Sequence, residues 1–268
     1  MTLSDTDFGS VLAEGKTKIV YAHPTRDDLV YLYHKDTLSA GDGARRSVLP
    51  GKGALACRTN SNVFYVLEVE GVPTHYVGMI GDRVNLVLPC TMIPLEVVMR
   101  RIAFGSYLRR HPEVAEGTRF EPTVVEFFYK NDALHDPLVT DEQIVEMNLA
   151  TKAEIESMRD IGRRVFAIIE AEWAKQNVTL VDLKIEFGRS KADASLMVAD
   201  VIDNDSWRIW PGGDRSRQLD KQVYRDLPEL GDAQLQQVLA NYRAVADLTD
   251  RWVLLDDHPL AADRQGRE

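Results

Sequence analysis

Short β-favouring runs separated by glycine and proline occupy residues 11 to about 105, and they constrain the fold more than any other feature of the sequence. Valine, isoleucine and tyrosine in these runs favour strands, whereas the intervening glycines and prolines favour turns. Because hairpins need only short connections, the pattern predicts an antiparallel, curved sheet. We expect strands at residues 18–21, 29–34, 74–80, 83–88 and 96–103, with one amphipathic helix over residues 53–70.

The second half of the chain has longer and more regular segments. A capping box, Thr151 with Glu154, begins a helix that continues to about residue 176, since its apolar residues recur at helical spacing. Further elements are predicted as strands at residues 122–130, 179–187 and 196–202 and as a helix over residues 232–255. The fold class predicted from these elements is α+β (mixed α/β).

Two prolines bracket a short connection at residues 89–94, and we place a domain boundary there. The expected division is an N-terminal β-rich domain, residues 1–90, and a C-terminal α/β domain, residues 91–268. This length is ample for one large or two smaller domains with packed cores.

Composition excludes several functional classes. With 42 acidic and 32 basic residues the net charge is -10, which argues against a nucleic-acid partner. Two cysteines cannot make a disulfide-rich secreted scaffold. The first ten residues do not have the pattern of a signal peptide, and no apolar run approaches the roughly 18 residues of a membrane span. We therefore expect a cytoplasmic protein that has no membrane partner.

Two glycine-containing segments near the N-terminus could bind an anion. In EGKTKIVY, Gly15 lies beside Lys16 and precedes Lys18 at the start of a strand, so backbone and ammonium groups can approach a phosphate. The segment is not a Walker A loop, and an ordinary turn with solvated lysines is the simpler alternative. In SAGDGARR, Asp42 lies between two glycines and before two arginines; a surface turn is the alternative.

The segment IPLEVVMRRIAFGSYLRR combines a cationic strand end with a Gly-Ser turn. Arg100 shares a strand face with Glu96, so an ion pair between them is the simpler explanation. Ser106 follows Gly105 and precedes a short helical run whose amides could bind an anion. Together these features are typical of a pocket for phosphate or carboxylate.

The strongest constellation is LVDLKIEFG followed by MVADVID. In a strand, Asp182, Lys184 and Glu186 lie on one face, and Asp200 is a single carboxylate within an otherwise apolar strand. If the two strands form a hairpin, Glu186 and Asp200 can converge on one cation, and oxygen ligands of this kind suit Mg²⁺. Lys184 would then neutralise charge between the metal and a phosphate. The alternative is a solvated outer face with Asp182 paired to Lys184.

Two further segments are rich in polar residues. KNDALHDP directly follows an apolar strand, although its aspartates can equally make local turns. In DNDSWRIWPGGDRSRQLDKQVYRD, Arg208 lies between two tryptophans, and the remainder can be a charged surface loop. The candidate residues from these segments are Lys130, Asp132, Arg208, Arg215, Asp220, Lys221 and Arg225.

Taken in order, these segments resemble the SAICAR synthetase (phosphoribosylaminoimidazole-succinocarboxamide synthase) family. The matching motifs lie within residues 14–226 and are EGKTKIVY, SAGDGAR, MIPLEVVMRRIAFGS, KNDALHDP, LVDLKIEFG, and ADVIDNDSWRIWP with DKQVYRD. DNDSWRIWP looks like the synthetase half of the bifunctional animal enzymes; without the carboxylase half, the chain is expected to be monofunctional. The resemblance implies a two-part architecture, an N-terminal antiparallel sheet with a kinase-like or ATP-grasp-like nucleotide cleft against a larger α/β part.

The same resemblance implies an activity. ATP would drive ligation of L-aspartate to the carboxylate of carboxylated aminoimidazole ribonucleotide (CAIR), giving SAICAR, ADP and phosphate through an acyl phosphate. A carboxylate is a poor acyl donor, and phosphorylation gives it a good leaving group. The protein must then position the reactants and neutralise charge.

The resemblance also assigns roles to individual residues. ATP would be bound by Gly15, Lys16, Lys18 and Lys184, with adenine against the backbone of a hinge between Val87 and Met92. Mg²⁺ would be held by Glu186 and Asp200. Lys184, Arg100 and Arg208 would be catalytic, since arginine suits carboxylate and phosphate oxygens. The substrate pocket would include Asp42, Arg100, Ser106 and Arg208, with Lys130, Asp132, Asp182, Arg215, Asp220, Lys221 and Arg225 as further candidates.

Two other functions use the same nucleotide cleft. A small-molecule kinase would transfer phosphate to a hydroxyl without needing aspartate; the protein-kinase HRDxxxxN and DFG motifs are absent from the sequence. A non-catalytic nucleotide-binding module would tolerate loss of the metal carboxylates, whereas Glu186 and Asp200 are both present.

Overall fold

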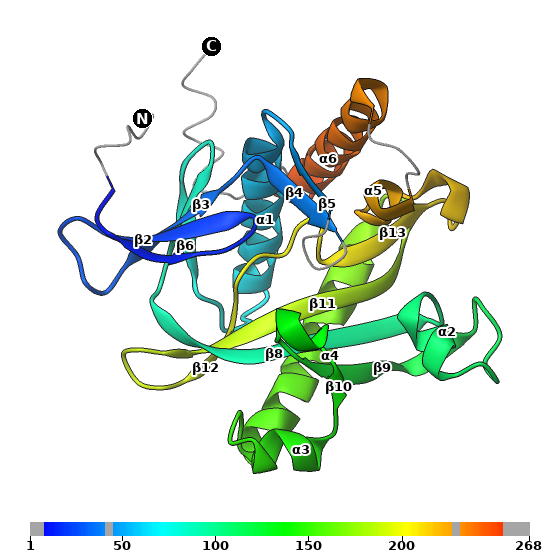
Figure 1. Cartoon of the computed structure of the whole chain (residues 1–268), viewed down its shortest axis with the longest axis horizontal. Helices are drawn as coiled ribbons and strands as arrows, with labels where there is room; N and C mark the ends of the chain where they lie inside the picture. The colour runs from blue at the N-terminus through cyan, green and yellow to red at the C-terminus, as the bar shows by residue number, and fades with distance from the viewer. Residues whose placement is uncertain (1–7, 41–44, 227–230, 254–268) are drawn as a thin grey trace.

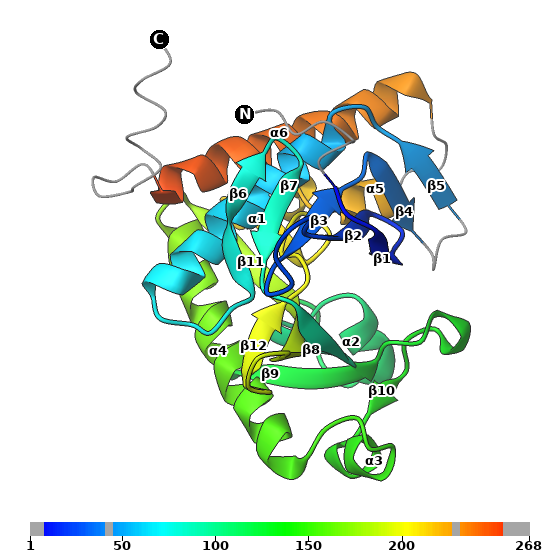
Figure 2. The same cartoon turned by 90° about the vertical axis from the view of Figure 1, so that its left-hand side faces the viewer.

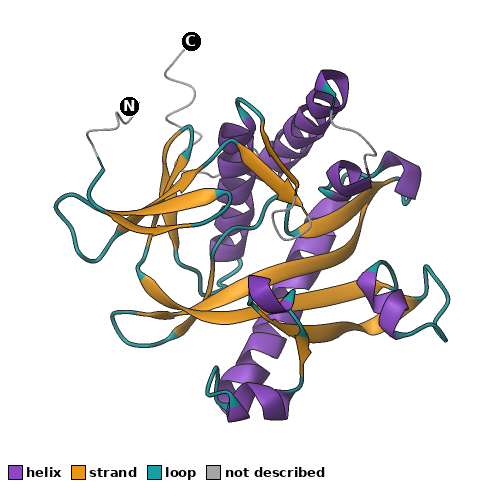
Figure 3. Ribbon diagram, viewed as in Figure 1, coloured by secondary structure: helices purple, strands orange, loops and turns teal. Residues whose placement is uncertain are grey.

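Three antiparallel sheets form the framework of the molecule (Figures 1 and 3). The computed structural model describes residues 8–40, 45–226 and 231–253. One sheet has five strands in the order β1 (Val11–Glu14), β2 (Lys18–Ala22), β3 (Val30–His34), β7 (Val84–Val87) and β6 (Tyr76–Gly81). A separate hairpin joins β4 (Thr37–Ala40) to β5 (Arg45–Val48).

The larger sheet has six strands. Its order is β10 (Leu138–Val139), β9 (Arg119–Tyr129), β8 (Cys90–Ile102), β11 (Val178–Ser190) and β12 (Leu196–Ala199), with β13 (Trp207–Pro211) paired to β11. Antiparallel pairing throughout these sheets confirms the predicted α+β class and its antiparallel character.

Long helices support the sheets. The helix α4 (Lys152–Ala174) packs on β8 and β11, and α1 (Lys52–Val69) lies along α6 (Asp232–Val253), as Figure 2 shows. The shorter helices are α2 (Ser106–Arg110), α3 (Asp141–Glu146), α5 (Gln222–Asp226) and the 3-10 turns Asp132–Leu134 and Arg215–Arg217. None of the helices in the described ranges is both long enough and apolar enough to cross a membrane.

Helix α4 forms where its capping box and apolar stripe predict it. The Thr151 hydroxyl accepts a hydrogen bond from the Glu154 amide (3.2 Å), and the Glu154 carboxylate accepts one from the Thr151 amide (2.8 Å). The buried face of the helix carries Ile155, Met158, Val165, Phe166, Ile169 and Trp173. These side chains join the largest core cluster, which also takes in residues of α1, β8 and β11. This core therefore includes residues on both sides of residue 90, and the two-domain division stays a prediction.

Several boundaries differ from those predicted from the sequence. Strand β8 begins at Cys90, before residue 96, because its first residues pair with the far end of β11. Strand β12 ends at Ala199, before residue 202, because Asp200 has a φ of 65° and turns the chain out of the strand. Elements β1, β4, β5, β10, β13, α3 and α5 are not predicted from the sequence. They are two to six residues long, which is too short to show a period.

Two buried histidines make the stability of this fold sensitive to acid. Burial lowers the pKa of both His34 and His75 to about 3. The ring of His34 shares a hydrogen bond with Asn85 (2.8 Å), and that of His75 packs on Phe64 at 5.2 Å between centroids. An unfolded imidazole has a pKa of about 6.5, so the unfolded chain binds more protons than the native one between about pH 6.5 and pH 3. The free energy of unfolding should therefore fall as the pH is lowered through this window, by up to ~1.4 kcal/mol per pH unit for each histidine.

We expect His75→Gln to reduce the number of protons taken up on unfolding at pH 5.5 by about 0.9, the fraction of unfolded imidazole that is protonated there. Urea denaturation across the pH window measures this number from the slope of stability against pH. An unchanged slope in His75→Gln would show that the buried ring does not titrate in this way.

Candidate functional site

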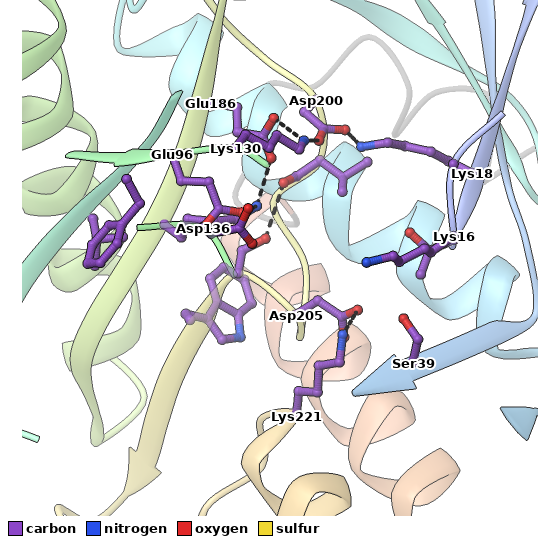
Figure 4. Close-up of a pocket in the computed structure, with 18 of the residues that line it drawn as sticks. Lys16, Lys18, Ser39, Glu96, Lys130, Asp136, Glu186, Asp200, Asp205 and Lys221 are labelled. Atoms are coloured by element: carbon purple, nitrogen blue, oxygen red, sulfur yellow. Dashed lines mark hydrogen bonds and ion pairs between the residues drawn. The ribbon is translucent and has the colours of Figure 1, made fainter. Parts of the chain in front are cut away.

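A cleft of about 990 Å³ is lined by residues from the five-stranded sheet and from the larger sheet (Figure 4). Its walls include ten lysines and arginines and eight aspartates and glutamates. The cleft therefore has a basic excess, although the chain as a whole has a net charge of -10. Local charge of this kind attracts anions regardless of the total.

The cleft brings together most of the residues singled out from the sequence. They come from strands β2, β8, β11 and β13, from α2 and α5 with the residue before it, from the β1–β2 turn and from the segments after β9 and β12, so they are far apart along the chain. Those that line it are Gly15, Lys16, Lys18, Arg100, Ser106, Lys130, Asp132, Asp182, Lys184, Glu186, Asp200, Arg208, Lys221 and Arg225.

Two carboxylates and two lysines form a connected row at one end of the cleft (Figure 4). The Lys130 ammonium lies 2.5 Å from Glu186 and 3.5 Å from Asp200, and Lys18 pairs with Asp200. The β11–β12 hairpin places these carboxylates, since Glu186 pairs with Ala199 across the ladder and Asp200 comes next. Glu186 and Asp200 therefore lie close enough for both to contact the Lys130 ammonium, and their predicted convergence on a metal cation stays a prediction.

Lys184 adds a third ammonium to the row. It lies 2.8 Å from Glu186 and 3.2 Å from Glu96. Burial would lower the pKa of Lys184, but the two carboxylates outweigh it and raise that pKa well above its usual range. Burial would likewise raise the pKa of Glu186, yet Lys184, Lys18 and Lys130 hold it well below its usual range. Both groups are therefore ionised at neutral pH, which is the state that phosphate or metal binding needs.

The donor set at this end of the cleft fits Mg²⁺. Within the described residues, no group of three or more His, Cys, Asp or Glu side chains could hold a metal by itself. Mg²⁺ commonly takes only one or two carboxylates and completes its shell with phosphate oxygens and water. Glu186 and Asp200 both reach Lys130, so both can approach a single cation.

An arginine pair forms a second part of the cleft. The Arg100 Nε donates to Glu126 (2.6 Å), and its guanidinium also contacts Asp182 (3.0 Å) and Ser106 (3.4 Å). Arg208 donates to the same Asp182 (2.5 Å). Asp182 thus holds two guanidinium groups side by side, which is suitable for binding a carboxylate or phosphate through several hydrogen bonds.

Two simpler alternatives are wrong. Arg100 pairs with Glu126 and Asp182 rather than with Glu96. Lys184 pairs with Glu96, whereas Asp182 pairs with the two arginines, so the expected pair between Asp182 and Lys184 does not form. The face that carries these residues is the wall of the cleft and not a solvated outer face.

An ion pair in the lining of the cleft connects two of the predicted segments. Lys16, in the turn after β1, lies 2.8 Å from Asp132 in the loop after β9. The Lys16 side chain is 37% exposed and that of Asp132 is 63% exposed, so solvent screens this contact and it can open for a ligand at little cost.

Four predicted residues lie outside the lining of the cleft in the described part of the chain. The Val87 side chain packs with Val30 and Leu32, and Met92 is exposed on β8. Arg215 is exposed and pairs with Glu116 (2.9 Å). Asp220 is buried and accepts hydrogen bonds from the backbone amides of β13 and α5, and burial raises its pKa to about 6. Asp42 lies outside the described residues.

Two residues of the site region, Glu126 behind the cleft wall and Asp205 in its lining, were not among those predicted from the sequence. Glu126 was within a predicted apolar strand, and the signal that drew attention to Asp200, a single carboxylate among apolar residues, applied equally to it. Glu126 accepts from Arg100 and Arg110 and is buried. Asp205 lines the cleft and pairs with Lys221 (2.7 Å). Nothing in the neighbouring sequence indicates that Asp205 forms an ion pair with Lys221.

Comparison with known proteins gives a consistent result. The family model described as SAICAR synthetase matches residues 11–241. A phosphoribosylaminoimidazole-succinocarboxamide synthase of Chloroflexus aurantiacus is 59% identical over 246 residues, which cover 92% of this chain and 98% of that protein.

Solved structures agree with this match. The phosphoribosylaminoimidazole-succinocarboxamide synthase of Ehrlichia chaffeensis has a TM-score of 0.81 and 31% identity, covering 90% of this chain and 98% of that one. A Type-2 SAICAR synthetase in complex with ADP has a TM-score of 0.78 and 32% identity, covering 88% of this chain and 96% of that one.

Proposed function

Since this chain belongs to the SAICAR synthetase family and is an ATP-dependent ligase of purine biosynthesis, we propose that it joins L-aspartate to the carboxylate of CAIR, giving SAICAR, ADP and phosphate. One observation carries the proposal: the cleft places a cluster of carboxylates and lysines next to a pair of arginines held by one aspartate. The first group suits the phosphates of ATP with Mg²⁺, and the second suits an anionic substrate.

The proposed chemistry has two steps. A carboxylate oxygen of CAIR attacks the γ-phosphorus of ATP, the bond to the β-γ bridging oxygen breaks, and ADP leaves. The amine of L-aspartate then attacks the carbonyl carbon of the acyl phosphate, phosphate leaves with the oxygen that bridged to carbon, and the amine loses a proton. Both steps concentrate negative charge on oxygen, so cationic side chains fixed in advance lower the barrier.

Each part of the cleft receives a role in this proposal. Glu186 and Asp200 would hold Mg²⁺, which would screen the phosphates of ATP and orient them. Lys184 would stabilise charge on the transferred phosphoryl group, and Gly15, Lys16 and Lys18 would contact the nucleotide phosphates. Arg100 and Arg208 would bind an anionic group of the substrate. Residues 87–92 would bind adenine through backbone hydrogen bonds. The positions of the Val87 and Met92 side chains therefore do not test that role.

The test is ADP release by the purified protein with Mg-ATP, omitting CAIR and L-aspartate in turn. The ligase should release ADP at a substantial rate only when both are present, and SAICAR should form in equal amount. ADP release without aspartate, accompanied by phosphorylation of a hydroxyl, would replace the ligase with a kinase. ATP binding without turnover under every condition would favour a non-catalytic module.

A further inference from the structure

Asp205 is held from behind by the C-terminal helix. Its carboxylate lines the cleft, where Oδ2 pairs with Lys221 (2.7 Å), while Oδ1 accepts a hydrogen bond from the Tyr242 hydroxyl (2.5 Å). Tyr242 lies on α6, is 1% exposed and is not part of the cleft lining. In Figure 4 the Asp205–Lys221 pair faces Ser39, apart from the row formed by Glu186, Lys130 and Asp200.

The surroundings of Tyr242 fix the direction of its hydroxyl. Its ring packs in an apolar cluster with Leu38, Leu49, Tyr224 and Val238, between α6 and the segment that leads into α1. The ammonium of Lys52, itself 1% exposed, lies 5.3 Å from the centre of the ring. A ring packed on all sides has a single orientation, so the hydroxyl can serve as a fixed donor.

The charges around Asp205 keep it an acceptor. Burial would raise its pKa, but Lys221 and Lys52 outweigh burial and hold it well below the usual range. Burial and the neighbouring carboxylates raise the pKa of Tyr242 well above its usual range, so its proton stays on the hydroxyl. The hydrogen bond therefore joins a neutral donor to a charged acceptor, which is the stronger kind.

We propose that Tyr242 is a positioning residue for the substrate side of the cleft: its hydroxyl fixes Asp205, and Asp205 in turn aims the Lys221 ammonium at a carboxylate or phosphate oxygen of CAIR or L-aspartate. This inference rests on the proposed function. Both Asp205 oxygens have protein partners, so Asp205 acts through Lys221 rather than as a ligand of its own. The effect should appear in the KM of the anionic substrate and spare that of ATP, because the pair lies apart from the Glu186 row.

The key variant is Tyr242→Phe, which removes the hydroxyl and keeps the ring. We expect KM for CAIR or L-aspartate to rise about tenfold or more, as for loss of one hydrogen bond to a charged group, with KM for ATP close to wild type. Tyr224→Phe is the matched control. Tyr224 is also fully buried in the same apolar cluster, but its hydroxyl lies 3.0 Å from Ser47 Oγ. It should retain the wild-type KM values.

A double-mutant cycle with Asp205→Asn separates positioning from packing. If Tyr242 acts through Asp205, adding Tyr242→Phe to Asp205→Asn should raise KM no further. Additive losses, or a Tyr242→Phe variant that changes only the melting temperature, would overturn the inference. Wild-type protein is assayed first, and if it forms no SAICAR, the proposed function fails. If the wild type is active and Tyr242→Phe has the same KM values, only the inference about Tyr242 fails.

Discussion

Glu186→Gln will lower kcat/KM for ATP by at least about a hundredfold, the scale on which removing one fixed electrostatic group from a reaction centre acts. Glu186 is 2% exposed and contacts Lys130 and Lys184, so the substitution removes the charge at the centre of the row and one of two carboxylates proposed for Mg²⁺. Mg²⁺ should then no longer strengthen ATP binding. Calorimetric titration of ATP with and without Mg²⁺, beside ADP release, measures both effects.

Glu170→Gln is the matched control for this variant. Glu170 likewise pairs with a basic side chain, the buried Arg101, from which its two oxygens accept at 2.8 Å each, but it lies outside the cleft lining. Its loss should cost stability and leave turnover close to wild type. Turnover by Glu186→Gln equal to that of Glu170→Gln would reject Glu186 as a metal ligand.

Arg100→Ala will lower the free energy of unfolding by about 3 kcal/mol, as when one partner is removed from a buried ion pair. Arg100 is 3% exposed and pairs with Glu126 and Asp182, both buried, so the change leaves two carboxylates with one fewer cation each. Each keeps another arginine, Arg110 or Arg208, which limits the loss to the lower part of the usual range. Urea denaturation measures it.

A fall in stability alone would therefore not separate a substrate role of Arg100 from a structural one. Arg208→Ala is the informative partner, because Arg208 shares Asp182 but leaves it paired with Arg100. It should cost much less stability while raising KM for the anionic substrate strongly. The account of the arginine pair fails if Arg208→Ala binds CAIR and L-aspartate normally, or if it is as unstable as Arg100→Ala.

The fold was predictable where a segment is long enough for its apolar residues to recur at a regular spacing. Helix α4 shows both a capping box and an apolar stripe, and it forms almost as expected. Elements such as β4 and β13 are too short to show a period: β4 pairs with the adjacent β5, and β13 pairs with β11, which lies earlier in the chain. The end of β12 was misplaced because Asp200 has a positive φ, which the apolar residues on either side of it do not indicate. The Asp200 side chain contacts Lys18 and Lys130 across the cleft, which are far away in sequence.

The site was predictable to a similar degree and for a similar reason. Strand alternation placed Asp182, Lys184 and Glu186 on one face, and the structure brings that face into the cleft. The choice of partners was not predictable, because it depends on which strands are neighbours. Glu126 reaches Arg100 across the β8–β9 ladder, and Tyr242 reaches Asp205 from a helix 37 residues further along the chain.

The most direct test of the account follows an oxygen atom. CAIR labelled with oxygen-18 in its carboxylate is turned over with Mg-ATP and L-aspartate, and the released phosphate is analysed by mass spectrometry. If the carboxylate is phosphorylated in this cleft and then attacked by the amine, every phosphate carries one labelled oxygen and the new amide keeps the other. Unlabelled phosphate beside labelled SAICAR would contradict the acyl phosphate, and with it the roles proposed for the cleft.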